Sequence, residues 1–267
     1  MKNIAYHLLA IACFISCGHS GNDYQYLERV DSMLAQEQTD SALYLIEHFN
    51  PAHLNEELTA FYRLLFVQSR YKAYRPTYSD SIINLAIDYY ENHGNSDLLA
   101  RCYFYKGGIL LDLDKKVQAL DNLKMAEKLV TTSSNYTLRH KIYYLLSFIN
   151  ANYQEKKVAL KYALKALECS KISQRPDHMA YDYGLLLRLY NSSLEEKDSC
   201  LYYCDLAIKM IDMIPASPPI NRAQIWGNIG VAFSSIDSDK AVQFLGRTRI
   251  FPWLTSTDHA RLHKQRY

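Results

Sequence analysis

Two stretches of periodic apolar residues, separated by a short polar turn, lie in the middle of the chain between Leu98 and Leu129. In both stretches apolar residues recur every three or four positions, which is the spacing of an amphipathic helix. The turn between them covers Asp112 to Lys116. Small residues, Gly107 in the first stretch and Ala119 in the second, would let the two helix axes approach closely where they cross. The pattern therefore predicts an antiparallel pair of helices.

The same alternation of apolar-periodic segments and polar breaks continues along most of the chain. The breaks carry residues that end or begin helices, such as Asn50-Pro51 and Asp80-Ser81. Gly and Pro are scarce, which suits helices rather than a sheet with many tight turns. Helices are expected over residues 24–36, 40–49, 54–72 and 80–90, in the central hairpin 98–130, and over 136–153, 156–169, 177–194, 198–213, 220–235 and 238–245.

Three positions of the central hairpin recur along the chain at intervals of about 40 residues. The position of Ala119 falls on small residues throughout, namely Ala42, Ser81, Ala119, Ala159, Cys200 and Ala241. The position of Gly107 falls on Ser69, Gly107, Ser147 and Gly230, but on Arg188 in the fifth unit. A second inward position falls on Ile46, Leu85, Leu123, Ala163, Cys204 and Leu245. This recurrence predicts an all-α solenoid of about six stacked hairpins.

The order of residue types in the central hairpin resembles a tetratricopeptide repeat (TPR). The residues that carry the resemblance are Tyr103, Gly107, Leu110, Ala119, Leu123 and Ala126. The resemblance implies a right-handed α-solenoid of TPR-like hairpins. The usual TPR interval is about 34 residues, and the proline that usually closes each unit is missing here. We therefore expect longer helices and looser turns than in the standard repeat. The matched closing positions are Thr131, Lys171 and Asp212.

Residues 1–16 have the features of a signal peptide. Lys2 supplies a positive charge, and the apolar run Ile4 to Ile15 is too short to span a bilayer. The residues before Cys17 resemble a bacterial lipoprotein signal, although Phe14 stands where Leu, Val or Ile is usual. The resemblance implies lipidation of Cys17, followed by a tether over residues 17–23. The alternative is an ordinary secretory signal with an incidental cysteine; Cys13 is a weaker candidate because it leaves too short an apolar run.

The repeat pattern covers residues 24–245 and then stops. Residues 246–267 show no helical face, contain Pro252 and collect five basic residues. We expect this basic tail to be a solvated terminus. Two alternatives remain, namely that the chain is a truncated member of a longer family, or that the tail binds phosphate or lipid headgroups.

The composition and motifs favour a binding protein over an enzyme. A formal net charge of +2 gives no reason to expect nucleic acid as a partner. The sequence has no Gly-rich phosphate loop, no nucleophile elbow and no His-Glu-x-x-His pair, and its nine histidines share no metal-ligand spacing. We therefore expect no catalytic residue, no metal and no cofactor, and we interpret the histidines as lone surface residues. Four further cysteines are expected to be buried free thiols, with disulfides between distant units left open: Cys102, Cys169, Cys200 and Cys204.

In TPR proteins the first helix of each hairpin lines a concave groove, so the resemblance implies a set of groove positions here. These positions carry a stripe of basic and aromatic residues. They are Arg63, Phe66 and Arg70 in one unit, Arg101 and Phe104 in the next, and Lys141, Tyr144 and Phe148 in the third; Asp182 follows in the fourth. Such a stripe would suit an extended peptide, acidic or ending in a free carboxylate. The alternative is that the rings pack internally and the cations are a solvated face.

The long, tyrosine-rich units resemble the extracytoplasmic sensory half of bacterial regulators in which TPR repeats precede a transmembrane helix and a DNA-binding helix-turn-helix. We therefore expect an exported scaffold, lipid-anchored at a bacterial cell membrane, that binds a protein or peptide. An accessory lipoprotein for envelope assembly or polymer uptake is the alternative. A less favoured one is an α/α-toroid glycan-active enzyme, whose acidic pair would have to come from Asp80, Asp97 and Asp198, residues better interpreted as helix caps.

Overall fold

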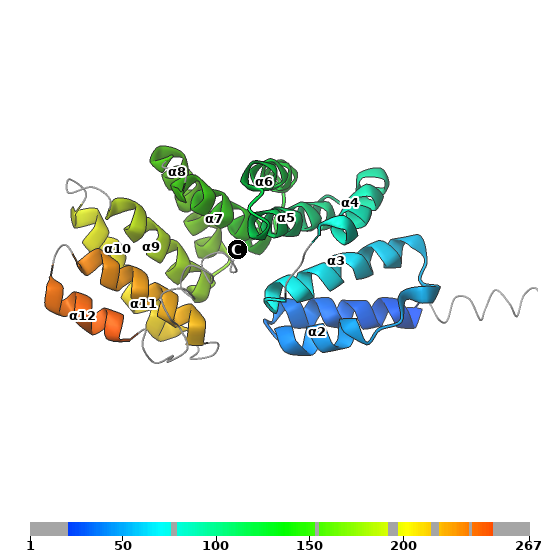
Figure 1. The fold of residues 1–267 in the computed structure, drawn as a ribbon, viewed down its shortest axis with the longest axis horizontal. Helices are drawn as coiled ribbons and strands as arrows, with labels where there is room; N and C mark the ends of the chain where they lie inside the picture. The colour runs from blue at the N-terminus through cyan, green and yellow to red at the C-terminus, as the bar shows by residue number, and fades with distance from the viewer. Residues whose placement is uncertain are drawn as a thin grey trace, which may run out of the picture. The chain divides into compact units, whose positions relative to one another are not determined.

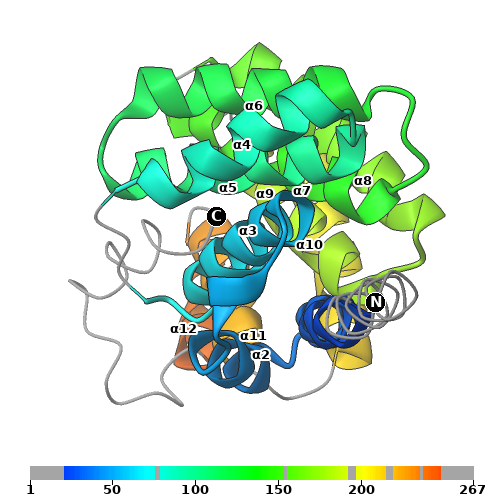
Figure 2. The ribbon, with the colours of Figure 1, turned by 90° about the vertical axis from the view of Figure 1, so that its right-hand side faces the viewer.

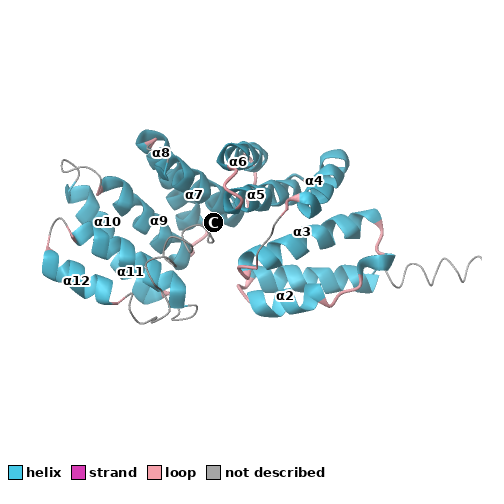
Figure 3. Ribbon diagram, in the orientation of Figure 1, coloured by secondary structure: helices cyan, strands magenta, loops and turns pink. Residues whose placement is uncertain are grey.

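The structure of the chain is a computed structural model, which describes residues 21–75, 79–152, 155–191, 197–214, 219–234 and 237–247. All regular structure in these ranges is helical, as the sequence predicts (Figure 3). The chain divides into two compact units, and the division follows Asn122, inside helix α6 (Lys116–Val130). The predicted signal peptide, Cys17 and the basic tail beyond Arg247 lie outside the described residues.

The first unit starts with a helix over residues 21–35, so that residues 21–23 of the expected tether are helical. Its other helices are α2 (Thr39–Glu47), α3 (Glu56–Lys72), α4 (Ser81–His93) and α5 (Ser96–Asp112), with a short 3-10 turn at Pro51–His53 (Figure 1). Helix α2 packs against α3, α3 against α4 and α4 against α5, and α3 also contacts α5. Apolar side chains of the first helix, α2 and α3 form one core cluster, which includes Leu27, Val30, Leu34, Ala42, Ile46 and Leu65.

The second unit is a stack of three hairpins. They are α7 (Tyr136–Asn152) with α8 (Lys156–Ile172), α9 (Pro176–Tyr190) with α10 (Lys197–Met213), and α11 (Pro219–Phe233) with α12 (Ser238–Gly246) (Figures 1 and 2). The first helices of successive hairpins also contact one another, α7 with α9 and α9 with α11. This layer of first helices is the feature of a TPR-type stack that the sequence predicts to carry the binding residues.

Asparagine caps mark the repeat interval in the backbone. An asparagine precedes α3, α5 and α7, and its side-chain oxygen accepts a hydrogen bond from the backbone N–H three residues later. This arrangement satisfies an otherwise unpaired donor of the first helical turn. The caps Asn55, Asn95 and Asn135 accept from Leu58, Leu98 and Leu138 at 2.8, 3.1 and 3.0 Å. The caps explain why the first helices of three units begin at equivalent positions.

The ends of α3, α5 and α8 are closed by backbone turns rather than by proline. A residue in the left-handed region, Tyr74, Asp114 or Gln174, follows each helix. The next residue then donates back to a carbonyl five positions earlier, as in Arg75 N–H to Arg70 O at 2.9 Å and Lys115 N–H to Leu110 O at 2.8 Å. This is the Schellman arrangement, which satisfies the last free carbonyls of a helix. These three helix ends are therefore terminated by backbone hydrogen bonds and need no proline.

The predicted inward positions are confirmed in most units, but they are wrong in α4 and at Leu245 of α12, which is 37% exposed. Ala42, Ala119, Ala159, Cys200 and Ala241 are all buried. In α4, however, Ser81 is exposed and the side chain of Leu85 is 48% exposed. The buried face of α4 is formed by Ile83, Ala86, Ile87 and Tyr90 instead. The sequence predicted the wrong face because the apolar residues of α4 cover more than half of its circumference, which leaves two faces that could turn inward.

Candidate functional site

The accessible side of α3 carries the first predicted binding residues. Thr59, Tyr62, Arg63, Phe66 and Arg70 are half-buried, whereas most of the other side chains in the body of the helix are buried. Their spacing of three or four residues places them on a single stripe of the helix. Arg63, Phe66 and Arg70 therefore lie together on one accessible face, as the sequence predicts.

An aromatic ladder extends this face within the first unit. We use the term for four half-buried rings, those of Tyr26, Phe49, Tyr62 and Phe66. Successive ring centroids along the ladder are 4.9, 5.8 and 5.9 Å apart, within the range of favourable aromatic pairs. The guanidinium of Arg70 lies 5.7 Å from the Phe66 centroid and forms an ion pair with Glu47 at 2.6 Å. The first unit thus carries four half-buried rings and two half-buried arginines near one another.

The next predicted pair, Arg101 and Phe104, is occupied by internal contacts. Arg101 donates to both carboxylate oxygens of Asp31 at 3.0 and 2.6 Å and to the side-chain oxygen of Gln68 at 2.6 Å. Phe104 is buried beside Tyr105, with 5.1 Å between ring centroids. A bidentate carboxylate pair uses the geometry with which an arginine would hold a ligand carboxylate. Arg101 therefore ties three helices of the first unit together, and its predicted contact with a ligand would require this pair to open.

The predicted residues of the second unit differ in their accessibility. Lys141 and Tyr144 of α7 are half-buried, and the Tyr144 ring lies edge-on to Tyr181 of α9 at 6.2 Å between centroids. Phe148 is buried, and the guanidinium of Arg188 lies 5.0 Å from its centroid. Arg188, which interrupts the small-residue pattern, thus makes a cation–π contact with the neighbouring hairpin. The binding role of the predicted stripe stays a prediction.

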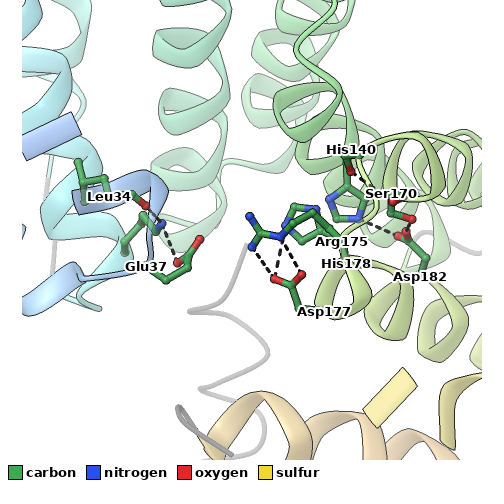
Figure 4. A network of polar contacts seen from close by, with 10 residues as sticks. Leu34, Glu37, His140, Ser170, Arg175, Asp177, His178 and Asp182 are labelled. Carbon is green, nitrogen blue, oxygen red and sulfur yellow. Dashed lines mark hydrogen bonds and ion pairs between the residues drawn. The ribbon is translucent and has the colours of Figure 1, made fainter. Parts of the chain in front are cut away.

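A buried polar cluster, which the sequence did not predict, joins α7, α8 and α9 (Figure 4). We call it the histidine cluster; it consists of His140, Ser170, His178 and Asp182. Asp182 is fully buried, accepts a hydrogen bond from Ser170 Oγ at 2.6 Å, and lies 2.9 Å from Nε2 of His140. The rings of His140 and His178 stack with their centroids 4.1 Å apart. The interpretation of these two histidines as surface residues is therefore wrong, since both are buried.

The electrostatics of the cluster follow from its burial. Burial raises the pKa of the Asp182 carboxyl, although His140 and Ser170 oppose the shift. Burial also lowers the pKa of His178, and the neighbouring His140 lowers it further. Nδ1 of each histidine is buried without a hydrogen-bond partner. At the surface end of the cluster, Arg175 donates to both oxygens of Asp177 at 2.9 and 2.6 Å, which holds the pKa of that carboxyl below its usual range against the effect of burial.

The cluster has the residue types of a catalytic or metal site but not the geometry. The hydroxyl of Ser170 donates to Asp182 rather than to an imidazole, so it is not activated as a nucleophile. Among the described residues, no group of three or more His, Cys, Asp and Glu side chains could hold a metal ion. One signal could have indicated the cluster, namely that His140, His178 and Asp182 all occur near the start of a first helix, on neighbouring units. Nothing in the spacing reveals that Ser170 joins them.

The four cysteines within the described residues are buried free thiols, as predicted. Burial raises the pKa of the Cys102 thiol to about 12 and that of Cys169 to about 11. A thiol with so high a pKa is almost entirely protonated at neutral pH and is a weak nucleophile. Cys200 occupies the inward position of α10 that alanine occupies in most other units, and Cys204 occupies the second inward position.

Comparison with known proteins supports the fold and does not assign a family. No protein-family model matches the sequence, and a search of curated proteins finds no match. Among solved structures, a Rap protein complexed with competence and sporulation factor is similar, with a TM-score of 0.65 and 13% identity over 86% of this chain. The apo form of RapI gives a TM-score of 0.65 and 15% identity over 85% of this chain. PilF of Pseudomonas aeruginosa gives a TM-score of 0.57 and 17% identity over 92% of this chain.

The chain spans 65% and 64% of the length of the two Rap structures, and 98% of PilF. These neighbours are TPR-type helical repeat proteins. At such low identity the likeness concerns the fold alone. The chain is accordingly an all-α protein built from TPR-like helical hairpins. In the part of the chain that the structure describes, no helix combines the length and the apolar character needed to cross a bilayer.

Proposed function

We propose that this chain is a membrane-anchored, extracytoplasmic scaffold that binds a protein or an extended peptide along its first helices. The observation that carries the proposal is the accessible stripe of α3, where two arginines accompany the aromatic ladder. Rings and guanidinium groups at a surface are the side chains that dominate binding energy in protein interfaces. The similar Rap structure is described as complexed with competence and sporulation factor, which supports a partner-binding role for this fold.

The proposed ligand is acidic because of the charges on that stripe. Arg70 is paired with Glu47, whereas Arg63 forms no ion pair or hydrogen bond with another described residue. A half-buried guanidinium without a carboxylate partner is suited to receive one from a ligand, and charge-assisted bonds of this kind are about twice as strong as neutral ones. In the second unit, α7 likewise carries a basic and an aromatic side chain, Lys141 and Tyr144, which are both half-buried.

We expect Arg63→Glu to weaken binding of an acidic peptide at least tenfold, about 1.4 kcal/mol, because it replaces attraction by repulsion. The probe is a set of linear peptides selected on the purified protein from a random display library, with affinities measured by fluorescence anisotropy. The matched control is Lys115→Glu, which makes the same charge change at an exposed turn residue of the same unit. Selected peptides that show no preference for acidic residues, or that bind the Arg63→Glu variant as well as the wild type, would contradict the proposal.

The proposed anchor is a lipid on Cys17. The support is the sequence alone, in which a charged start and a short apolar run precede this cysteine. Two acyl chains provide stable membrane attachment where one gives only reversible binding. A lipid anchor at the cell membrane would place the repeats in the periplasm or at the cell exterior, as in the sensory half of the TPR regulators that the sequence resembles.

We expect the wild type to fractionate with membranes and to incorporate labelled fatty acid, and Cys17→Ala to lose both properties. Cys13→Ala is the matched control, because it removes a neighbouring cysteine within the apolar run and should leave both properties intact. Labelling of the Cys17→Ala variant at the wild-type level would show that the anchor is elsewhere or absent.

A further inference from the structure

The stack of His140 on His178 lies at the junction between two successive hairpins. His140 belongs to α7 and His178 to α9, and the two helices are in contact. Asp182, also on α9, reaches across to His140 of α7 and to Ser170 of α8. The packing of the α9 hairpin on the α7–α8 hairpin therefore includes a buried group of ionisable side chains.

The stack tolerates one positive charge better than two. The ring centroids of His140 and His178 are 4.1 Å apart with 11° between their planes. Asp182 lies against His140 and can balance a charge there, at 2.9 Å. The nearest carboxylate to His178 is that of Asp177, at 3.9 Å from Nε2, and both of its oxygens are already bonded to Arg175. The positive charge of a protonated His178 would therefore be buried beside another imidazole, with little negative charge nearby to balance it.

We propose that the α7–α9 junction is an acid-triggered joint, in which protonation of His178 loosens α9 from α7 and α8. In the loosened state the His178 imidazole reaches water and can bind a proton. Proton binding therefore favours the loosened state. The joint closes again when the pH rises and His178 returns to its neutral form. This device would act on the stack itself, whatever the chain binds.

Other ionisable groups lie around the stack, so the pH effect of His178 must be measured separately from theirs. Lys141 and Arg175 add positive charge near His178 and so favour its neutral form, and Asp177 opposes them. The pKa of His178 is lower in the folded protein than in the unfolded chain. Its contribution to the stability of the junction is therefore complete above the ordinary histidine pKa of about 6.5 and is lost as the pH falls below that value. Asp182 has a raised pKa, so its own contribution has the opposite sign. Tyr144 lies beside the cluster, with its ring centroid 6.0 Å from that of His140.

The test compares the wild type with His178→Phe, which keeps a flat ring in the stack and removes the titrating nitrogen atoms. Hydrogen exchange of α9 is followed by mass spectrometry at about pH 7.5 and about pH 5.5, with times corrected for the intrinsic exchange rate. We expect the protection of α9, relative to the variant, to fall about tenfold in the wild type at the lower pH. Peptides from α3 in the first unit serve as the internal control and should show equal protection in both proteins.

Two results would overturn the proposal. One is a ratio of wild-type to variant protection in α9 that does not change with pH. The other comes from a titration of the wild type by NMR, in which the His178 imidazole becomes protonated near pH 6.5 while α9 remains protected. The NMR titration needs no substitution, so it remains decisive if His178→Phe does not fold, and His178→Leu provides a second variant.

Discussion

Replacing Asp182 by leucine is expected to lower the free energy of unfolding of the second unit by about 3 kcal/mol. Asp182 is fully buried and is the carboxylate partner of His140. Without it, Nε2 of His140 loses its partner, while Nδ1 of the same ring already has none. A buried imidazole with neither nitrogen bonded carries the full penalty of desolvation. Ser170 is affected less, because its hydroxyl can still donate to the carbonyl of Leu167 at 3.0 Å.

The measurement is urea unfolding followed by circular dichroism at neutral pH, and Asp177→Leu is its matched control. Asp177 lies on the same helix, but its ion pair with Arg175 is partly exposed, so we expect its loss to lower stability by about 1 kcal/mol or less. A second arm combines Asp182→Leu with His140→Phe, which removes the buried imidazole as well. Because apolar replacement of a whole buried pair is often neutral, the double variant should recover most of the loss. Equal effects of Asp182→Leu and Asp177→Leu would show that the buried network contributes no special stability.

Gly230→Leu is expected to destabilise the last hairpin by about 2 kcal/mol through overpacking. A Cβ atom at Gly230 would lie 2.6 Å from Cγ of Leu245 and 3.1 Å from the backbone nitrogen of the same residue. The side chain of Leu245 could move, but the backbone of α12 cannot move without separating the two helices. Gly230 is thus the point of close approach between α11 and α12, in the position that Gly107 occupies in the central hairpin.

Gly184→Ala is the control for that substitution, since it adds a side chain to a helical glycine where there is room. Its Cβ would meet the side chain of Asn228 at 3.4 Å and that of Ile225 at 4.0 Å, which are ordinary contacts. Because alanine is favoured over glycine within a helix by up to about 1 kcal/mol, we expect this variant to be as stable as the wild type or slightly more stable. Thermal unfolding would compare the two. If the Gly230→Leu variant had the same melting temperature as the wild type, the two helices would not cross at this glycine.

The helices could be predicted from the sequence because their signals are local. The asparagine caps, the apolar spacing and the small residues at the crossings all act within one helix or one hairpin. The face of α4 could not be predicted in the same way. Ser81 and Leu85 fit the repeat spacing as well as the residues that are buried, and only the packing of α4 against α3 and α5 selected Ile83, Ala86, Ile87 and Tyr90.

The candidate site was predictable in part for the same reason. The stripe Arg63, Phe66 and Arg70 lies on one helix, so its spacing alone places these residues together. The fate of Arg101 depends on Asp31, 70 residues earlier in the chain, and on Gln68. No local pattern joins residues so far apart, so a residue expected to face a ligand is found in an internal ion pair.

By itself, the sequence determined that this protein is a chain of helical hairpins with an interval of about 40 residues, because the helix period and the repeat period are properties of neighbouring residues. Only the tertiary structure decided which ionisable side chains are buried and which partners they find. His140, Ser170, His178 and Asp182 lie on three helices, and their pairing depends on how one hairpin packs on the next. Burial and charge pairing are collective properties of the packed stack, which is why two scattered histidines of the sequence become members of one buried polar cluster.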